Sequence, residues 1–213
     1  MNKIYVQYGC GLCAPDNWIN FDASPTLRIQ KIPLLGKLLR RQLNVIFPNN
    51  VQYGNIEKGL PIQDNTCDGI YCSHVLEHFS LNAFRRVIRN TYKMLKGSRT
   101  GIFRCVLPDL EQMARKYINE LDTGNVTANY DFIKSIHTGC KEERTQGLKA
   151  ALHFIFGSIH LWMWDAKSLH KELTDTGFVN IRQCSFNDCE DEMFKSVESE
   201  ERFKNAIAFE CKK

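Results

Sequence analysis

Residues 59–79 read GLPIQDNTCDGIYCSHVLEHF and combine a turn, a short apolar run and a dense group of polar side chains. Asp64 and Asn65 are typical turn residues, and the apolar run Gly69–Cys72 follows them. A short apolar run bounded by turn residues predicts a central strand covered on both faces. Ser73–His78 comes directly after it, and the carboxyl ends of strands in open α/β sheets face the ligand crevice. We therefore expect functional residues here.

Length and composition are those of an ordinary globular protein. The chain has 213 residues, of which 43% are apolar and 24% are charged, which predicts a single domain over 1–213. The net charge of +4 is small, and no Lys/Arg stripe with interleaved aromatics is present, so we expect no nucleic-acid partner. No stretch approaches the roughly 20 apolar residues of a membrane span.

The N-terminus and the cysteines indicate the compartment. MNKIYVQYG enters a strand pattern without a signal-peptide apolar region. The nine cysteines are odd in number and several lie in strand-like runs, as reduced thiols do, so we expect a soluble cytoplasmic protein. Cys10 and Cys13 have the C-x-x-C spacing, but no second ligand pair or thioredoxin-like context accompanies them. We therefore assign no metal ligands.

Two glycines follow the first predicted strand, Ile4–Tyr8. Gly9 and Gly11 allow a sharp turn and a close backbone approach to a ligand. The next apolar run ends at Asp22, whose carboxylate is well placed for both hydroxyls of a ribose. The dinucleotide fingerprint expects its acidic residue about 20 positions on, whereas Asp22 lies much nearer, which argues against a dehydrogenase. The short link over 12–17 predicts a reduced first helix.

Strands and helices alternate along the rest of the chain. Ser80 is a good N-cap and Gly97 a stop for a helix over Leu81–Leu95, and Asp165 and Gly177 bracket a later one. The alternation predicts an α/β fold with a doubly wound, mainly parallel seven-stranded sheet and an antiparallel last strand. The remaining expected elements are strands at Trp18–Phe21, Val51–Tyr53, Gly101–Leu107, Phe178–Phe186 and Ala206–Cys211, and a helix at Leu110–Leu121.

Two segments interrupt this order. Residues 24–50 contain the amphipathic, basic stretch Leu34–Arg41, which indicates either a peripheral contact with a lipid surface or acidic substrate, or a helix that covers the sheet or the cofactor cleft. The second interpretation is favoured. Residues 122–160 mix glycines with short helical patterns, and we interpret them as a substrate-side elaboration.

Several blocks together resemble the class I S-adenosylmethionine-dependent methyltransferases, along nearly the whole chain. The closest likeness is to small methyltransferase-domain proteins associated with bacterial surface-polysaccharide synthesis. The resemblance implies a Rossmann-like methyltransferase fold and S-adenosylmethionine as cofactor. It also implies methyl transfer to a small-molecule or glycan acceptor. The blocks are Tyr8–Gly11, Trp18–Asp22, Gly54–Ile56, Gly59–Asn65, Ser73–His78, Val106–Asp109 and His160–Asp165.

The resemblance also implies a set of cofactor-binding residues, ordered along the strand ends. Gln7 and Asn55 depart from it, because many class I enzymes have an acidic residue at each of these positions. The set comprises Tyr8, Gly9, Cys10 and Gly11 at the methionine part, Asp22 at the ribose, Asn55 and Ile56 at the adenine, and Ser73 and His74 at the methyl end.

Three residues are candidates for catalysis. His74 is the first candidate base, because its pKa lies near neutrality and it follows the central strand; alternatively it bonds to backbone and shapes the pocket. Asp109 could hold a substrate hydroxyl, although a helix N-cap is the favoured interpretation. His160 could reach the substrate side. Glu77 and His78 are expected to be structural, capping or orienting His74.

Three classes of function remain open. The first is a methyltransferase for a small molecule or glycan in cell-surface polysaccharide biosynthesis. The second is a non-catalytic cofactor-binding or scaffold protein of such a pathway, which the departure at Gln7 keeps open. The third is a nucleotide-sugar or nicotinamide enzyme, against which the position of Asp22 counts. The oligomeric state is not assigned.

Overall fold

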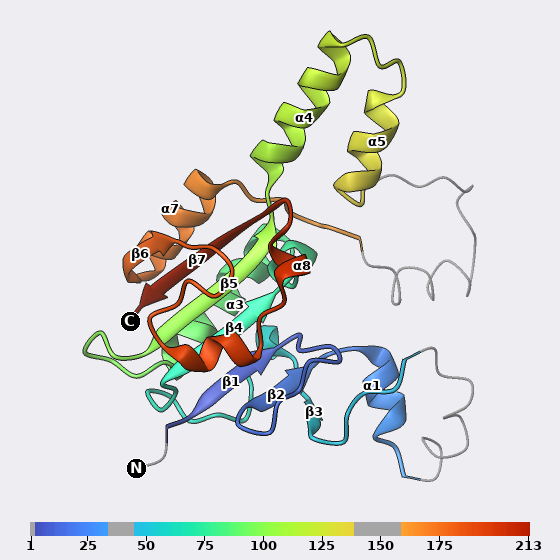
Figure 1. The fold of residues 1–213 in the computed structure, drawn as a ribbon. Coiled ribbons are helices and arrows are strands. Elements are labelled where there is room, and N and C mark those ends of the chain that lie inside the picture. The colour runs from blue at the N-terminus through green and yellow to red at the C-terminus, as the bar shows by residue number, and fades with distance from the viewer. Residues whose placement is uncertain (1–2, 34–44, 139–158) are drawn as a thin grey trace.

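The computed structural model describes residues 3–33, 45–138 and 159–213. Within them, seven strands form one sheet in the order β3-β2-β1-β4-β5-β7-β6 (Figure 1). All pairs from β3 to β5 are parallel, and β7 runs antiparallel to both β5 and β6. The predicted fold class is confirmed. The strands are β1 (Tyr5–Tyr8), β2 (Ile19–Asp22), β3 (Val51–Tyr53), β4 (Gly69–Ser73), β5 (Ile102–Pro108), β6 (Val179–Gln183) and β7 (Ala206–Lys212).

Helices of very different lengths surround this sheet. The α-helices are α1 (Pro25–Gln30), α3 (Leu81–Met94), α4 (Leu110–Asp122), α5 (Ala128–Ser135), α7 (Ala166–Thr176) and α8 (Glu200–Phe203). Single 3₁₀ turns are η1 (Ile56–Lys58), η2 (Leu76–His78) and η3 (Glu192–Ser196). No helix in these described parts of the chain is long and apolar enough to cross a membrane.

The strand order reverses between β1 and β4. The chain moves from β1 outward through β2 to β3, and then returns to place β4 and β5 on the other side of β1. In open α/β sheets, ligands bind at the carboxyl ends of the strands beside such a switch point. Gly9, which follows β1, and Ser73, which ends β4, therefore lie at the expected ligand edge.

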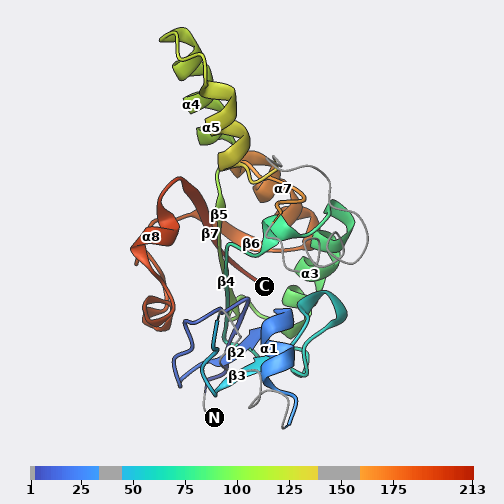
Figure 2. The same ribbon diagram turned by 90° about the vertical axis from the view of Figure 1, so that its right-hand side faces the viewer.

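Two apolar layers enclose the sheet. Ile70 and Cys72 of β4 belong to the larger cluster, together with the apolar positions of α3 and α7, whereas Tyr71 belongs to the smaller one. Figure 2 shows α3 and α7 on one side of the sheet and the segment that carries α8 on the other. Phe194 and Val197 of that segment are buried in the smaller cluster. The central strand is thus covered on both faces, but the second cover is mostly loop and short helical turns.

The ends of α3 and α7 test two capping predictions. Asp165 and Ser168 form a capping box at the start of α7, and Gly177 ends the helix in the left-handed conformation, as predicted. Gly97 does not end α3. The helix ends at Leu95 in extended backbone, because the Cys67 N–H donates to the Met94 carbonyl and so satisfies a free helix-end group.

The predicted reduced helix over 12–17 is wrong, because these residues form turns only. Two buried amides replace it. The Gln7 Nε2 donates to the Cys13 carbonyl (2.7 Å) and to Asn20 Oδ1 (2.5 Å), and the Asn20 Nδ2 donates to the Pro15 carbonyl (3.1 Å). These bonds satisfy backbone carbonyls that a helix would otherwise pair internally.

The two interrupting segments are only partly within the described residues. At the ends of 24–50, Leu27 of α1 and Phe47 pack with Cys10, so these parts support the glycine loop; Leu34–Arg41 lies outside the described residues. In 122–160, α5 folds back on α4 as a hairpin that projects from the end of the sheet (Figure 1), and 139–158 lies outside.

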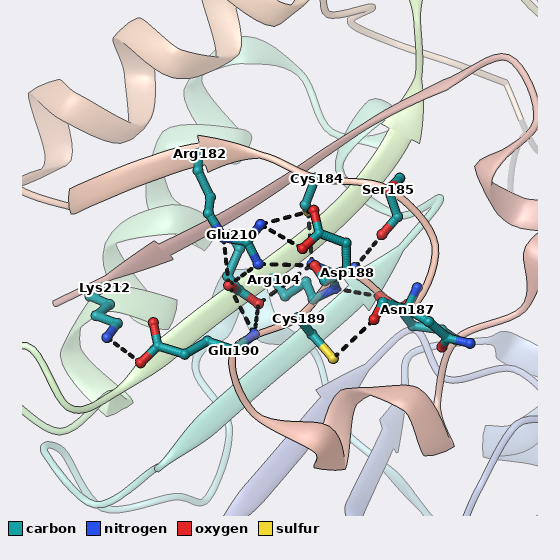
Figure 3. A network of polar contacts seen from close by, with 11 residues as sticks. Arg104, Arg182, Cys184, Ser185, Asn187, Asp188, Cys189, Glu190, Glu210 and Lys212 are labelled. Carbon is teal, nitrogen blue, oxygen red and sulfur yellow. Dashed lines mark hydrogen bonds and ion pairs between the residues drawn. The ribbon is translucent and has the colours of Figure 1, made fainter.

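A buried charged network fixes the cover on the second face (Figure 3). The Arg104 side chain from β5 is fully buried and pairs with Glu198, also fully buried, and with Glu210. Its guanidinium also donates to the carbonyls of Ser185 and Asp188, each at 2.8 Å. The loop after β6, which precedes α8 in the chain, is therefore hydrogen-bonded to the middle of the sheet.

Candidate active site

The glycine loop after β1 has a strained backbone that only glycine adopts freely. Gly9 has φ +64° and Gly11 has φ +55°. A Cβ atom on Gly9 would lie 2.2 Å from Val75 Cγ2, whereas one on Gly11 would meet nothing within 4 Å. Gly9 therefore packs the loop against the segment after β4, and Gly11 borders open space.

Asp22 holds this loop from the end of β2. Its Oδ2 accepts the Gly11 N–H (3.0 Å) and its Oδ1 accepts the Ser24 N–H (2.7 Å). The carboxylate is nearly buried, with 9% of the residue exposed. Each oxygen keeps further acceptor capacity, so Asp22 both shapes the loop and presents acceptors beside it.

The segment after β4 turns sharply at His74, which has φ +53°. The His74 ring Nε2 lies 2.8 Å from the Arg202 carbonyl, and the Arg202 guanidinium donates to the Ser73 carbonyl (3.1 Å). The Ser73 hydroxyl is buried and has no hydrogen-bond partner within the described residues. α8 thus fixes the turn, while one hydroxyl is left to bond a ligand.

Glu77 lies at the centre of a group of histidines. Its Oε1 is 3.7 Å from His74 Nδ1, 3.9 Å from His78 Nε2 and 4.0 Å from His160 Nε2. The Glu77 carbonyl accepts the N–H groups of Leu161 and Trp162, which brings His160 to the motif. Glu77 is 1% exposed, and neither carboxylate oxygen has a hydrogen-bond partner within the described residues.

Comparisons of the sequence with known protein families identify a methyltransferase domain. Residues 7–103 match the family model described as a methyltransferase domain, and a search of curated protein sequences found no match. Residues 7–103 therefore carry a methyltransferase domain. The matched segment of this domain runs from Gln7 to β5 and contains both the glycine loop and Ser73–His78.

Solved structures show the same methyltransferase fold. A SAM-dependent methyltransferase from Archaeoglobus fulgidus is 16% identical with a TM-score of 0.51, covering 99% of this chain and 86% of that one. A possible histamine N-methyltransferase from Thermotoga maritima is 14% identical (TM-score 0.53, 100% and 83% covered). Phosphoethanolamine N-methyltransferase 2 from Haemonchus contortus, in complex with S-adenosyl-L-methionine, is 9% identical (TM-score 0.50, 99% and 48% covered).

The methyltransferase edge of the sheet fits its cofactor, S-adenosylmethionine. Gly11 borders space that no atom of the described residues fills, and the Ser73 hydroxyl has no hydrogen-bond partner among them. Asp22 supplies acceptors for hydroxyl groups. Gln7 fits as well, because its amide donates to the Cys13 carbonyl at the far end of the loop, which a carboxylate could not do. The departure at Gln7 therefore leaves the loop held in place.

Other residues of the implied cofactor set have structural contacts of their own. Asn55 caps η1 through the Glu57 N–H, and the side chains of Tyr8 and Ile56 are buried in the core. The Tyr8 hydroxyl lies 3.2 Å from Thr91 Oγ1. Contacts from Tyr8 and Ile56 to the cofactor would come from their backbones, and the adenine role of Asn55 stays a prediction.

The three predicted catalytic residues do not form one group. Asp109 Oδ1 accepts the N–H groups of Glu111 and Gln112 at the start of α4, in the favoured capping role. His74 and His160 instead converge on Glu77. Which of the three takes part in catalysis stays a prediction.

Burial shifts the pKa values around Glu77. It raises the pKa of the Glu77 carboxyl to about 7 and lowers the pKa of His160 to about 4. Burial also lowers the pKa values of His74 and His78. The distances are those of ion pairs, but neutral imidazoles at pH 7 make no salt bridges, so the Glu77 carboxyl lies among uncharged rings.

The sequence alone does not predict Glu77 as the centre of this group, nor Arg202 and His137 as its neighbours. The His137 ring lies 4.6 Å from the His160 ring. The spacing H-x-x-E-H in residues 74–78 was the available signal for Glu77. Nothing near Arg202 or His137 in the sequence points to the site, because both approach it from distant segments.

Proposed function

We propose that this protein transfers the methyl group of S-adenosylmethionine to a nucleophilic atom of a small-molecule or glycan acceptor. The observation that carries the proposal is the glycine loop: two left-handed glycines, held by Asp22, lie beside the unpartnered Ser73 hydroxyl at the switch point of the sheet. Two structural neighbours bear the names of N-methyltransferases of small molecules, one of them as a possible function.

When bound, S-adenosylmethionine would supply a methyl carbon on a positively charged sulfur, which leaves as a neutral thioether when the acceptor displaces it. A hydroxyl acceptor would pass its proton to a base, for which His74 is the first candidate. The protein mainly has to position the two reactants. In our proposal, Gly9–Gly11 and Asp22 hold the cofactor, Ser73 bonds its methionine end, and His74 faces the acceptor.

The surroundings of the strand ends support a proposal for the acceptor class. The described residues near His74 present imidazoles, a carboxyl and the Arg202 guanidinium, which suits a polar acceptor. We propose a hydroxyl-bearing small molecule or sugar, in a cell-surface polysaccharide pathway. The resemblance of the sequence blocks supports this pathway.

Calorimetric titration with S-adenosylmethionine and S-adenosylhomocysteine tests the cofactor site. We expect micromolar binding to the wild-type protein, a loss of more than about tenfold in Asp22→Ala and no change in the exposed control Asp64→Ala. Asp22→Asn, which keeps one acceptor oxygen for the loop, serves if Asp22→Ala does not fold. Folded wild-type protein that binds neither ligand would refute the proposal.

A further inference from the structure

The Glu77 carboxylate lacks the partners that a buried charged group requires. It is 1% exposed, and both of its oxygens are without hydrogen bonds within the described residues. A buried carboxylate without partners costs several kcal/mol, so natural proteins pair such groups, hold them protonated or use them as metal ligands. The three ring nitrogens that face it lie at 3.7–4.0 Å, too far to bond it directly.

Two of the facing imidazoles present lone pairs to this carboxylate. The His78 Nδ1 lies 3.1 Å from the Ile159 carbonyl, and the His74 Nε2 lies 2.8 Å from the Arg202 carbonyl. A carbonyl only accepts, so in each ring the outer nitrogen carries the hydrogen. In the neutral ring, the inner nitrogen then directs a bare lone pair at Glu77. Lone pairs and a carboxylate that converge on one point repel one another unless a proton or a metal cation lies between them.

The spacing of these atoms is close to that of a metal site. One ligand atom each from Glu77, His78 and His160 lies within 4.8 Å of the other two. Bonds of about 2.0–2.1 Å in a tetrahedral zinc site separate ligand atoms by about 3.4 Å. Oε1 lies 3.9 and 4.0 Å from the two Nε2 atoms, so a contraction of roughly half an ångström would bring the carboxylate to this spacing from each histidine.

We propose that Glu77, His78 and His160 bind one divalent transition-metal ion at the acceptor side of the site. The hydrogen bond from His78 to the Ile159 carbonyl is the outer contact that orients metal-binding histidines in other proteins. Two imidazoles and one carboxylate favour zinc or a related first-row ion over magnesium, which prefers oxygen ligands. His74, with Nδ1 at 3.7 Å from Glu77, lies next to the ion.

The ion would be open to an acceptor. The side chains of His78 and His74 are 35% and 28% exposed, so the group can be reached from solvent on their side. Val75 packs on Gly9, which places the ion at the same edge of the sheet as the cofactor loop. An open coordination position there would bind an acceptor hydroxyl and lower its pKa; this role, unlike the binding itself, rests on the proposed function.

Calorimetric titration of chelator-treated, dialysed protein with Zn²⁺ and with Mn²⁺ tests the site. We expect about one ion per chain. Binding should weaken more than about tenfold in Glu77→Gln and in His160→Ala. The exposed histidine of α7 provides the matched control, and His170→Ala should bind as the wild type does. Unchanged binding in Glu77→Gln would refute the site; if that variant does not fold, His78→Ala takes its place.

Cobalt(II) substitution distinguishes this site from the nine cysteines of the chain. We expect absorption bands of nitrogen and oxygen ligation that disappear in Glu77→Gln. A thiolate charge-transfer band that persists in Glu77→Gln would overturn the assignment.

Titration of the metal-free protein with S-adenosylmethionine separates the two proposals. Cofactor binding without metal binding overturns only the metal site, and metal binding without cofactor binding overturns only the proposed function.

Discussion

Gly9 and Gly11 have nearly the same backbone conformation but different surroundings. Both have positive φ, yet only at Gly9 would a side chain collide with Val75. The sequence indicates that both glycines turn the chain. The sequence does not indicate that the loop also contacts the segment after β4 at Gly9.

This difference predicts unequal costs for alanine at the two positions. Gly11→Ala should lower the free energy of unfolding by about 1–2 kcal/mol, the cost of left-handed backbone. Gly9→Ala adds overpacking against Val75 and should cost about 1–3 kcal/mol more. Urea unfolding measures both. Equal losses in the two variants would mean that Val75 moves aside without cost.

Asp68, at the start of β4, is a residue whose contribution depends on pH. Its carboxylate accepts from the Ile4 N–H (2.8 Å) and from Lys96 Nζ (2.7 Å). Burial alone would raise the pKa of Asp68, but the bonds from Lys96 and Ile4 outweigh it and lower this pKa below its ordinary 3.8. The folded state therefore gains stability above pH 3.8, and this gain is lost as the pH falls through the folded-state pKa.

Asp68→Asn should accordingly lower the free energy of unfolding by about 1 kcal/mol at pH 7 and by less at pH 3. Urea titrations of wild type and variant at the two pH values measure the difference. Asp64→Asn, an exposed change four residues earlier, should have little effect at either pH. A loss that is the same at pH 3 as at pH 7 would contradict the assigned role of Lys96.

At the scale of elements, short polar contacts replace or end helices. Asn20 and Gln7 hold the link between β1 and β2, and a backbone bond from Cys67 ends α3. Asp109 and Asp165 begin α4 and α7 as caps. Caps are encoded locally, so the sequence predicts them. The link over 12–17 and the end of α3 differ from prediction because they depend on partners from other segments of the chain.

The capping and catalytic interpretations of Asp109 predict different results for a matched pair of variants. Asp109→Asn keeps an oxygen for the Glu111 and Gln112 N–H groups, so a cap should lose little stability, whereas Asp109→Ala should lose about 0.5–2 kcal/mol. Thermal unfolding measures both, with a methyl-transfer assay beside it. If Asp109→Asn is fully stable but inactive, Asp109 acts on the acceptor as well.

At the scale of the whole molecule, the Arg104 network ties the loop after β6 to the sheet. That loop leads to α8, whose Arg202 holds Ser73 and His74. The segment that covers one face of the sheet therefore also contacts the turn after β4, which leads to Glu77. Figure 3 shows Glu210, from β7, between Arg104 and Arg182, so one carboxylate serves two guanidinium groups.

Removal of Arg104 should therefore be costly. Arg104→Met leaves the buried carboxylate of Glu198 unpaired, and we expect a loss of about 3–5 kcal/mol in urea unfolding. Arg115→Met breaks an exposed pair with Glu111 on α4 and should cost less than about 0.5 kcal/mol. Similar losses in both variants would show that Glu198 finds another partner or a proton.

The sequence by itself determined the sheet class, the strand positions, the glycine loop and the caps of α4 and α7. These features follow from local patterns: apolar periodicity, left-handed glycines and capping residues act within a few positions of themselves. Only the tertiary structure placed His160 and Arg202 beside Ser73–His78 and gave Glu77 its central position. Those contacts join segments about 80 to 130 residues apart, and burial of a carboxylate among imidazoles exists only once the chain has folded.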